Sequence, residues 1–145
     1  MAYMKALHAN IAQYIGTSPQ AIALVSQGQF VGAPNWSHDI LTEKGKNPGV
    51  TLAVPANTGF EVGGVSIVKG AHNLPLAKAF VDWVLTPEAG ALNVKLSNRG
   101  STIATVAPAA GAPTLASVSL VNYDRQWATD NKTRILQLWQ TTVGL

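Results

Sequence analysis

Residues 65–89 read VSIVKGAHNLPLAKAFVDWVLTPEA, and this stretch decides the expected fold. The apolar run at residues 65–68 predicts a buried strand that ends at Lys69-Gly70. Asn73-Leu74-Pro75 then begins a helix, because residues 76, 80, 81, 84 and 85 are all apolar and recur at helical spacing. Thr86-Pro87-Glu88 caps a second helix that continues towards Gly100. A strand followed by amphipathic helices predicts an α/β fold.

The pattern extends in both directions from this stretch. We expect helices over residues 3–14, from Ser18-Pro19 to near Gly28, and from Asn131 towards the C-terminus. Further strands are expected at residues 30–33 and 51–54, with a solvated loop at 43–49 and an extended crossing segment at 101–122. Three strands make a poor sheet for about six helices, which indicates that partners of the sheet are missing.

The amino-acid composition limits the size of the domain, its partners and the kinds of site that it can contain. The chain has 145 residues, 47% of them hydrophobic, which suits one compact domain or a piece of a larger one. Ten Lys and Arg against seven Asp and Glu give a net charge of +3 without a basic run, so nucleic acid is not an expected partner. The absence of cysteine excludes disulfides and thiolate zinc sites. No signal peptide is recognisable in this chain, and Pro and Gly interrupt the uncharged residues 100–123 too often for a membrane span.

Several segments together resemble the C-terminal part of bacterial extracytoplasmic solute-binding proteins, in the ferric-iron, phosphonate and sugar-phosphate binding group that serves ABC importers. The more specific match is the order of strand, short polar loop and Phe80-Val81-Asp82-Trp83 helix, followed by Thr86-Pro87-Glu88-Ala89. The other matching segments are Leu7–Ile11 with Tyr14, Thr17–Pro19, Val25–Gly32 and Thr58–Glu61.

The resemblance implies a partial periplasmic-binding-protein fold of type II, an incomplete two-lobe architecture with a short sheet flanked by helices. Residues 1–40 would be a second-lobe portion with a cleft and hinge segment, 41–107 a first-lobe C-terminal portion, and 108–145 a crossing segment with the C-terminal helix. Such proteins are about twice as long, so the chain is expected to be a segment whose export signal would lie outside it. The implied function is non-enzymatic capture of a small anionic solute, in the periplasm, for an ABC permease.

The first candidate ligand-binding residues are Thr17 and Ser18, at a helix N-terminus where free N–H groups favour an anion. The resemblance places this loop in the cleft. A plain helix cap is the alternative for both residues, and the sequence leaves the two readings open.

Asn35, Trp36 and Ser37 are candidates from the densest polar cluster of the chain. Trp36 and Ser37 stand where ferric-binding relatives would carry two tyrosines, so a stacked or hydrogen-bonded organic ligand fits better than iron. His38 and Asp39 alone are too few ligands for a metal site, and for Asp39 we expect only local backbone bonds in a hinge turn. Ferric-iron binding by non-tyrosine ligands is kept as an alternative.

Glu61 is the last candidate, because the glycine-rich residues around it let a ligand approach the backbone closely. Its carboxylate could accept hydroxyls of a sugar or an ammonium group, and a solvated loop acid is the alternative. Phe80, Trp83 and Trp139 are expected in the core. No catalytic constellation is found, so neither catalytic residues nor cofactors are expected. The alternative for the whole chain is a ligand-free segment that self-associates, for example as a homodimer.

Overall fold

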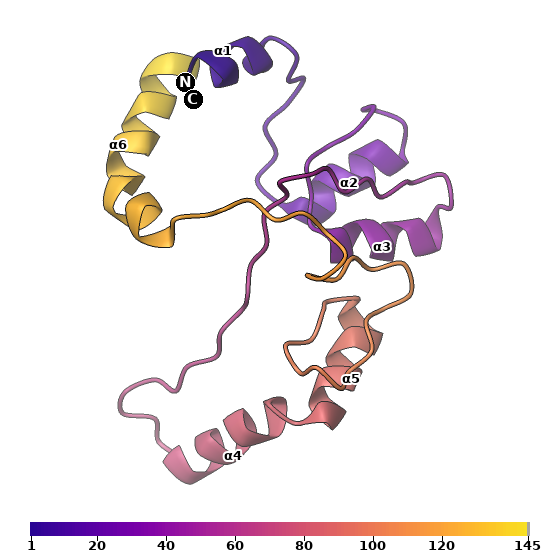
Figure 1. The fold of residues 1–145 in the computed structure, drawn as a ribbon, viewed down its shortest axis with the longest axis vertical. Helices are drawn as coiled ribbons and strands as arrows, with labels where there is room; N and C mark the ends of the chain where they lie inside the picture. Colours follow the sequence, from indigo (N-terminus) through magenta and orange to yellow (C-terminus); the bar gives the residue numbers. More distant parts are fainter. Residues whose placement is uncertain (145) are drawn as a thin grey trace. The chain divides into compact units, whose positions relative to one another are not determined.

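The computed structural model describes residues 1–144. The regular secondary-structure elements of these residues are all α-helices (Figure 1). Within residues 1–144 six helices follow one another: α1 (Ala2–His8), α2 (Ser18–Ser26), α3 (Ser37–Lys46), α4 (Leu74–Val84), α5 (Pro87–Ser97) and α6 (Arg125–Val143).

Side-chain caps explain where three of these helices begin. Asn73 accepts a hydrogen bond from Leu76 N at 3.1 Å at the start of α4, and Thr86 accepts one from Ala89 N at 3.3 Å at the start of α5. Both starts were predicted from the sequence and are confirmed. Asp124 accepts from Trp127 N at 2.9 Å, so α6 begins six residues before the expected Asn131.

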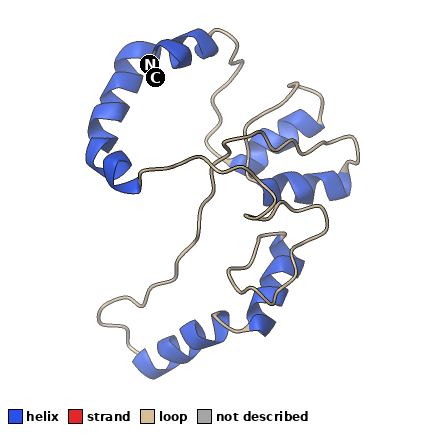
Figure 2. Cartoon of the chain, viewed as in Figure 1, coloured by secondary structure: helices blue, strands red, loops and turns tan. Residues whose placement is uncertain are grey.

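The predicted α/β fold is wrong: within residues 1–144 there is no sheet (Figure 2). The strands expected at 30–33, 51–54 and 65–68 are irregular segments, and the strand pairing is limited to an isolated parallel bridge between Thr58 and Leu120. A strand is stable only when a neighbour satisfies its backbone groups and covers its side chains. Val31 and Val68 are instead 107% and 77% exposed.

Helix α3 corrects a second expectation, because the sequence predicted a strand end and a solvated loop over its residues. Asp39 lies in the first turn of α3, while Lys44 and Lys46 lie in the last turn, an arrangement that suits the helix dipole. Lys46 also donates to Glu43 at 3.0 Å within the helix. The charges that resemble a loop therefore support a helix whose one buried residue is Ile40.

The chain divides into two compact units. The first combines residues 1–16 with those from Asn122 onward, and its helices α1 and α6 contact each other. Tyr14 packs edge-on against Trp139 at 5.5 Å between ring centroids and hydrogen-bonds His8 at 3.0 Å. The predicted lobe division at residues 40 and 107 concerns a longer protein and stays a prediction.

The second unit, Thr17–Val121, holds the buried core. Helices α2 and α3 pack through Ile22, Ile40 and Val50, supported by Val25 and Leu52. A separate small cluster forms where Ala89 and Val94 of α5 are buried.

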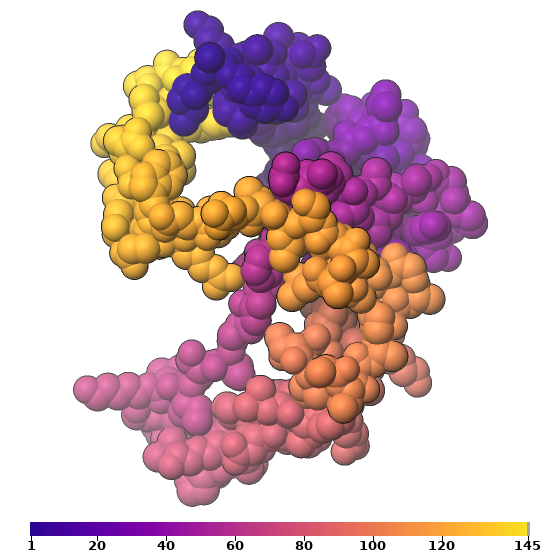
Figure 3. Space-filling model, viewed as in Figure 1, coloured from indigo at the N-terminus to yellow at the C-terminus, as the bar shows by residue number. Residues whose placement is uncertain are grey.

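The core does not extend to helix α4. The rings of Phe80 and Trp83 lie 6.0 Å apart between centroids, but the two residues are 53% and 42% exposed. The prediction that these two residues lie in the core is therefore wrong. On the face shown in Figure 3, the magenta segment that leads to α4 is a single chain wide over part of its length. Val65 in this segment is 51% exposed.

Candidate functional site

The most densely hydrogen-bonded polar cluster lies where α2 and α3 begin side by side (Figure 1). The Ser18 hydroxyl, in the first turn of α2, lies at hydrogen-bonding distance from Asn35 Oδ1 and 2.5 Å from Asp39 Oδ2. Because a hydroxyl has one proton, Ser18 donates to one of these oxygens at a time. The cluster of Ser18, Asn35 and Asp39 therefore joins residues 17 and 21 positions apart in the sequence.

Asn35 fixes the loop before α3 onto the start of α2. Its Nδ2 donates to the Ser18 carbonyl oxygen at 2.9 Å, and its Oδ1 accepts from Trp36 N at 2.8 Å. The amide thus uses both its donor and its acceptor side. Two backbone segments that are separate in sequence are held at a fixed spacing by one side chain.

Both helices begin without a capping side chain. Thr17 is the N-cap of α2 and Trp36 the N-cap of α3, and neither makes a side-chain cap hydrogen bond. The first N–H groups of a helix have no acceptor inside the helix, and they carry the positive end of its dipole. Two such ends meet at the Ser18–Asn35–Asp39 cluster, where the Asp39 carboxylate is the acidic group.

His38 lies beside this cluster with its Nε2 atom buried and without a hydrogen-bond partner. The same atom is 3.5 Å from Asp39 Oδ1, and the imidazole stacks near the Trp36 ring at 6.4 Å between centroids. Burial lowers the pKa of His38 below its usual 6.5, the Asp39 charge opposes this shift, and the Arg99 charge adds to it. The imidazole is therefore held neutral near pH 7.

The sequence named five of the residues at this end of the helix pair: Thr17, Ser18, Asn35, Trp36 and Ser37. The structure brings them together, with Trp36 47% exposed at the surface of the cluster. Glu61 lies apart from them in the sequence, in an exposed irregular segment before α4. Whether any of the six binds a ligand stays a prediction.

Sequence reasoning missed the part that Asp39 and His38 take in the cluster. The expected local backbone bonds of Asp39 are replaced by a side-chain contact to Ser18 from another helix. Its position in the first turn of α3 became recognisable only once that segment was seen to be a helix. His38 and Asp39 contribute two possible metal ligands, and within residues 1–144 no group of three His, Cys, Asp or Glu side chains could hold a metal ion. The alternative of iron binding by non-tyrosine ligands thus has no built site among these residues.

A hollow of about 560 Å³ opens beside the core of the same helix pair. The residues that line it include no charged side chain, and the six larger apolar ones are Ile22, Val25, Phe30, Val31, Ile40 and Val50. None of the six predicted ligand-binding residues lines this hollow. We call it the apolar hollow below.

The class of protein follows from comparison with known sequences. The family described as bacterial extracellular solute-binding protein matches residues 1–119, so the chain belongs to that family. A Haemophilus influenzae protein described as uncharacterized is 34% identical over 150 residues. The match covers 99% of this chain but 43% of that relative's length. No solved structure was found to match, and no helix within residues 1–144 is both long and apolar enough to cross a membrane.

Proposed function

We propose that this chain is part of a protein that captures a small organic anion, phosphorylated or phosphonate, for an ABC importer. Membership of the extracellular solute-binding family supports a non-enzymatic binding role outside the cytoplasm, with a transporter as partner. The observation that supports an anionic ligand is that two helix N-termini without capping side chains meet at Ser18 and Asn35. Such N–H groups bind phosphate without needing a basic side chain.

The side chains at this end of the helix pair determine which chemical groups of a ligand can bind there. The hydroxyls of Thr17 and Ser37 supply donors for phosphate oxygens. The Ser18 hydroxyl exchanges its acceptor on Asn35 or Asp39 for the ligand when the ligand binds. Trp36 is half exposed and offers a face on which the organic part can stack. The Asp39 carboxylate repels a bare oxyanion, so a hydroxyl, ammonium or protonated phosphate group of the ligand faces it.

Glu61 would complete the site from the opposite side of a cleft in the longer protein. It would accept sugar hydroxyls or an ammonium group when the lobes close on the ligand, as hinge closure brings separated segments together. In this proposal residues 1–40, 41–107 and 108–145 contribute to different parts of the two lobes. The ligand shifts the population towards the closed form that the permease binds.

Tryptophan fluorescence tests the site with glucose 6-phosphate and methylphosphonate as probes, and with glucose as the neutral control. We expect both anions, but not glucose, to change the emission of the wild-type protein. The change should persist in Trp127→Phe, which removes a tryptophan of the other unit, and disappear in Trp36→Phe. Emission that does not respond to either anion in the folded protein would contradict the proposal.

Calorimetric titration of Ser18→Ala and Glu61→Gln separates the two sides of the proposed site. Ser18→Ala should weaken binding by about 10- to 150-fold, since one hydrogen bond to a charged group contributes about 1.5–3 kcal/mol. Glu61→Gln should weaken binding of the hydroxyl-bearing sugar phosphate more than that of methylphosphonate. Equal affinity of Glu61→Gln and wild type for both probes removes Glu61 from the site.

A further inference from the structure

The solvent-accessible surface of the chain is larger than that of a compact protein of the same mass. It amounts to 10902 Å². A compact protein of 15.2 kDa exposes about 7,100 Å², and two separate compact bodies of the sizes of the two units about 8,400 Å². The excess is therefore at least about 2,500 Å², however the two units are arranged. This is the size of a permanent protein–protein interface.

Part of this excess lies at the apolar hollow. Ile22, Ile40 and Val50 are buried at 5–8% exposure, and all three also line the hollow, so the core is open on that side. Val31, at its rim, is 107% exposed. The hollow has no charged lining residue, and its walls combine these apolar side chains with the polar residues Ser26, Asn47 and Thr51. Such a mixed surface suits a protein segment that inserts apolar side chains between polar contacts.

The family comparison indicates what covers this hollow. The relative from Haemophilus influenzae matches 99% of this chain with 43% of its own length, so more than half of that protein lies outside the match. We propose that the apolar hollow is the docking surface for apolar side chains from this remaining part of the longer solute-binding protein. The proposal rests on the family membership and on the greater length of this relative, and it is independent of the ligand proposed above.

A chimera tests the proposal, with this chain replacing the matching part of the Haemophilus influenzae relative. Hydrogen exchange is measured at residues 28–33 and 49–53, which border the hollow, in the chimera and in the 145-residue chain. We expect these amides to exchange at least about 100-fold more slowly in the chimera. Once covered, they can exchange only when the surrounding structure opens with them. Binding of the dye anilinonaphthalene sulfonate, strong for the chain, should fall in the chimera.

Two variants identify the hollow as the surface that is covered. Val31→Asp in the chimera places a charge in the docking surface and should restore both fast exchange and dye binding. Lys44→Glu changes charge at an exposed position of α3 that does not line the hollow, and it should leave both unchanged. Equal exchange in chain and chimera, or equal effects of the two variants, would overturn the proposal.

Sedimentation of the 145-residue chain provides a second measurement that does not need the chimera to fold. A monomer that binds the dye is the expected result. A dimer whose residues 28–33 and 49–53 are protected would show that a second copy fills the hollow. A bound small molecule detected by native mass spectrometry, lost in Val31→Asp, would show that the hollow is a ligand site. Either of these two results overturns the proposal.

Discussion

Asn35 is the residue on which the arrangement of the candidate site depends. Its amide donates to the Ser18 carbonyl, accepts from Trp36 N, and lies within reach of the Ser18 hydroxyl. Together these contacts need a donor and an acceptor on the same planar group, because Nδ2 donates and Oδ1 accepts. Serine or aspartate at this position could not replace both.

Replacing Asn35 should loosen the joint between the two helices. We expect Asn35→Ala to lower the free energy of unfolding by about 1–3 kcal/mol, because two hydrogen bonds of about 1 kcal/mol are lost and the Ser18 carbonyl loses its donor. Urea denaturation measures the change. Gln29→Ala, which removes the exposed contact between Gln29 and Gln27, is the control and should cost less than about 0.5 kcal/mol. Equal stability of Asn35→Ala and wild type would contradict this role.

His38 should make stability depend on pH. Its pKa is lowered below 6.5 in the folded protein, chiefly by burial, so the unfolded chain binds the proton more strongly. The stability that neutral His38 contributes is complete above pH 6.5 and is lost as the pH falls below 6.5 towards the lowered pKa. Urea midpoints at pH 7.5, 6.5 and 5.5 should fall more steeply for wild type than for His38→Gln.

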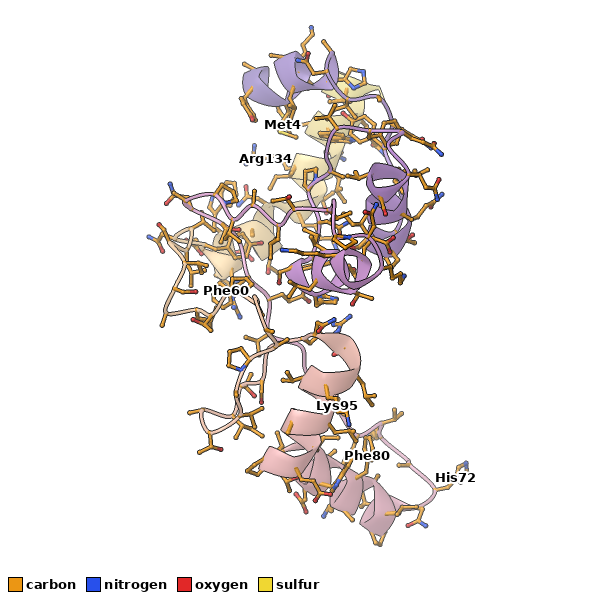
Figure 4. The ribbon with its side chains drawn as sticks, turned by 90° about the vertical axis from the view of Figure 1, so that its right-hand side faces the viewer. Met4, Phe60, His72, Phe80, Lys95 and Arg134 are labelled. Carbon is orange, nitrogen blue, oxygen red and sulfur yellow. The ribbon has the colours of Figure 1, made fainter. Side chains whose placement is uncertain are left out.

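His72 provides the control for this titration. Figure 4 shows its side chain directed away from α4, and it is exposed. His72→Gln should keep the wild-type pH dependence. If His38→Gln and wild type lose the same stability between pH 7.5 and 5.5, then His38 is not the group that titrates.

At the scale of elements, glycines in two helices show how packing decides the effect of the same substitution. Gly45 in α3 has no atom within 4 Å of the position that a Cβ would occupy. Gly90 in α5 is buried, and a Cβ there would lie 2.9 Å from Ser101 Oγ and 3.2 Å from Val106 Cγ2. The segment after α5 therefore packs on this helix at a distance that only glycine permits.

The two alanine variants should change stability in opposite directions. Gly45→Ala is expected to raise the free energy of unfolding by about 0.5–1 kcal/mol, since alanine restricts the unfolded chain and favours the helix. Gly90→Ala gains the same propensity but must displace Ser101, Ile103 and Val106, and should lower stability by about 1–3 kcal/mol. Thermal unfolding followed by circular dichroism distinguishes them. A stabilising Gly90→Ala would mean that residues 101–106 do not pack on α5.

At the scale of the whole molecule, the segment between residues 59 and 73 separates the two helix pairs of the second unit. All of its residues are exposed except Ala71, and none belongs to a helix. Exposed irregular backbone is where proteases cut first. Lys69 is a trypsin site in this segment, whereas Lys44, Lys78 and Lys95 lie within helices.

Brief trypsin treatment should therefore cut after Lys69, and after the also exposed Arg99 that follows α5, before it cuts within the helices. Mass spectrometry should detect residues 1–69 and 70–145 before any fragment that ends inside α3, α4 or α5. Lys69→Gln should abolish the fragments 1–69 and 70–145 and leave cleavage after Arg99 unchanged. Early cleavage within the helices at an unchanged rate in Lys69→Gln would contradict the exposure of this segment.

The sequence predicted the starts of two helices, α4 and α5, in which a capping side chain and a proline stand together. Asn73-Leu74-Pro75 and Thr86-Pro87 combine a capping side chain with proline in the first turn, and both helices begin there. Helix α3 has neither signal, because Trp36 is its N-cap and makes no side-chain bond, and this helix was missed. The three short apolar runs predict buried strands, but an apolar run supplies no partner for a ladder.

The sequence by itself determined the family, the starts of α4 and α5 and the residue types of the candidate site, because these depend on local spacing and residue chemistry. Only the tertiary structure decided that the apolar runs remain unpaired and that Asp39 contacts Ser18. It also decided that the core is open at the apolar hollow. These features depend on contacts between segments distant in sequence, whose formation is set by packing and by which partners are present, and local pattern encodes neither.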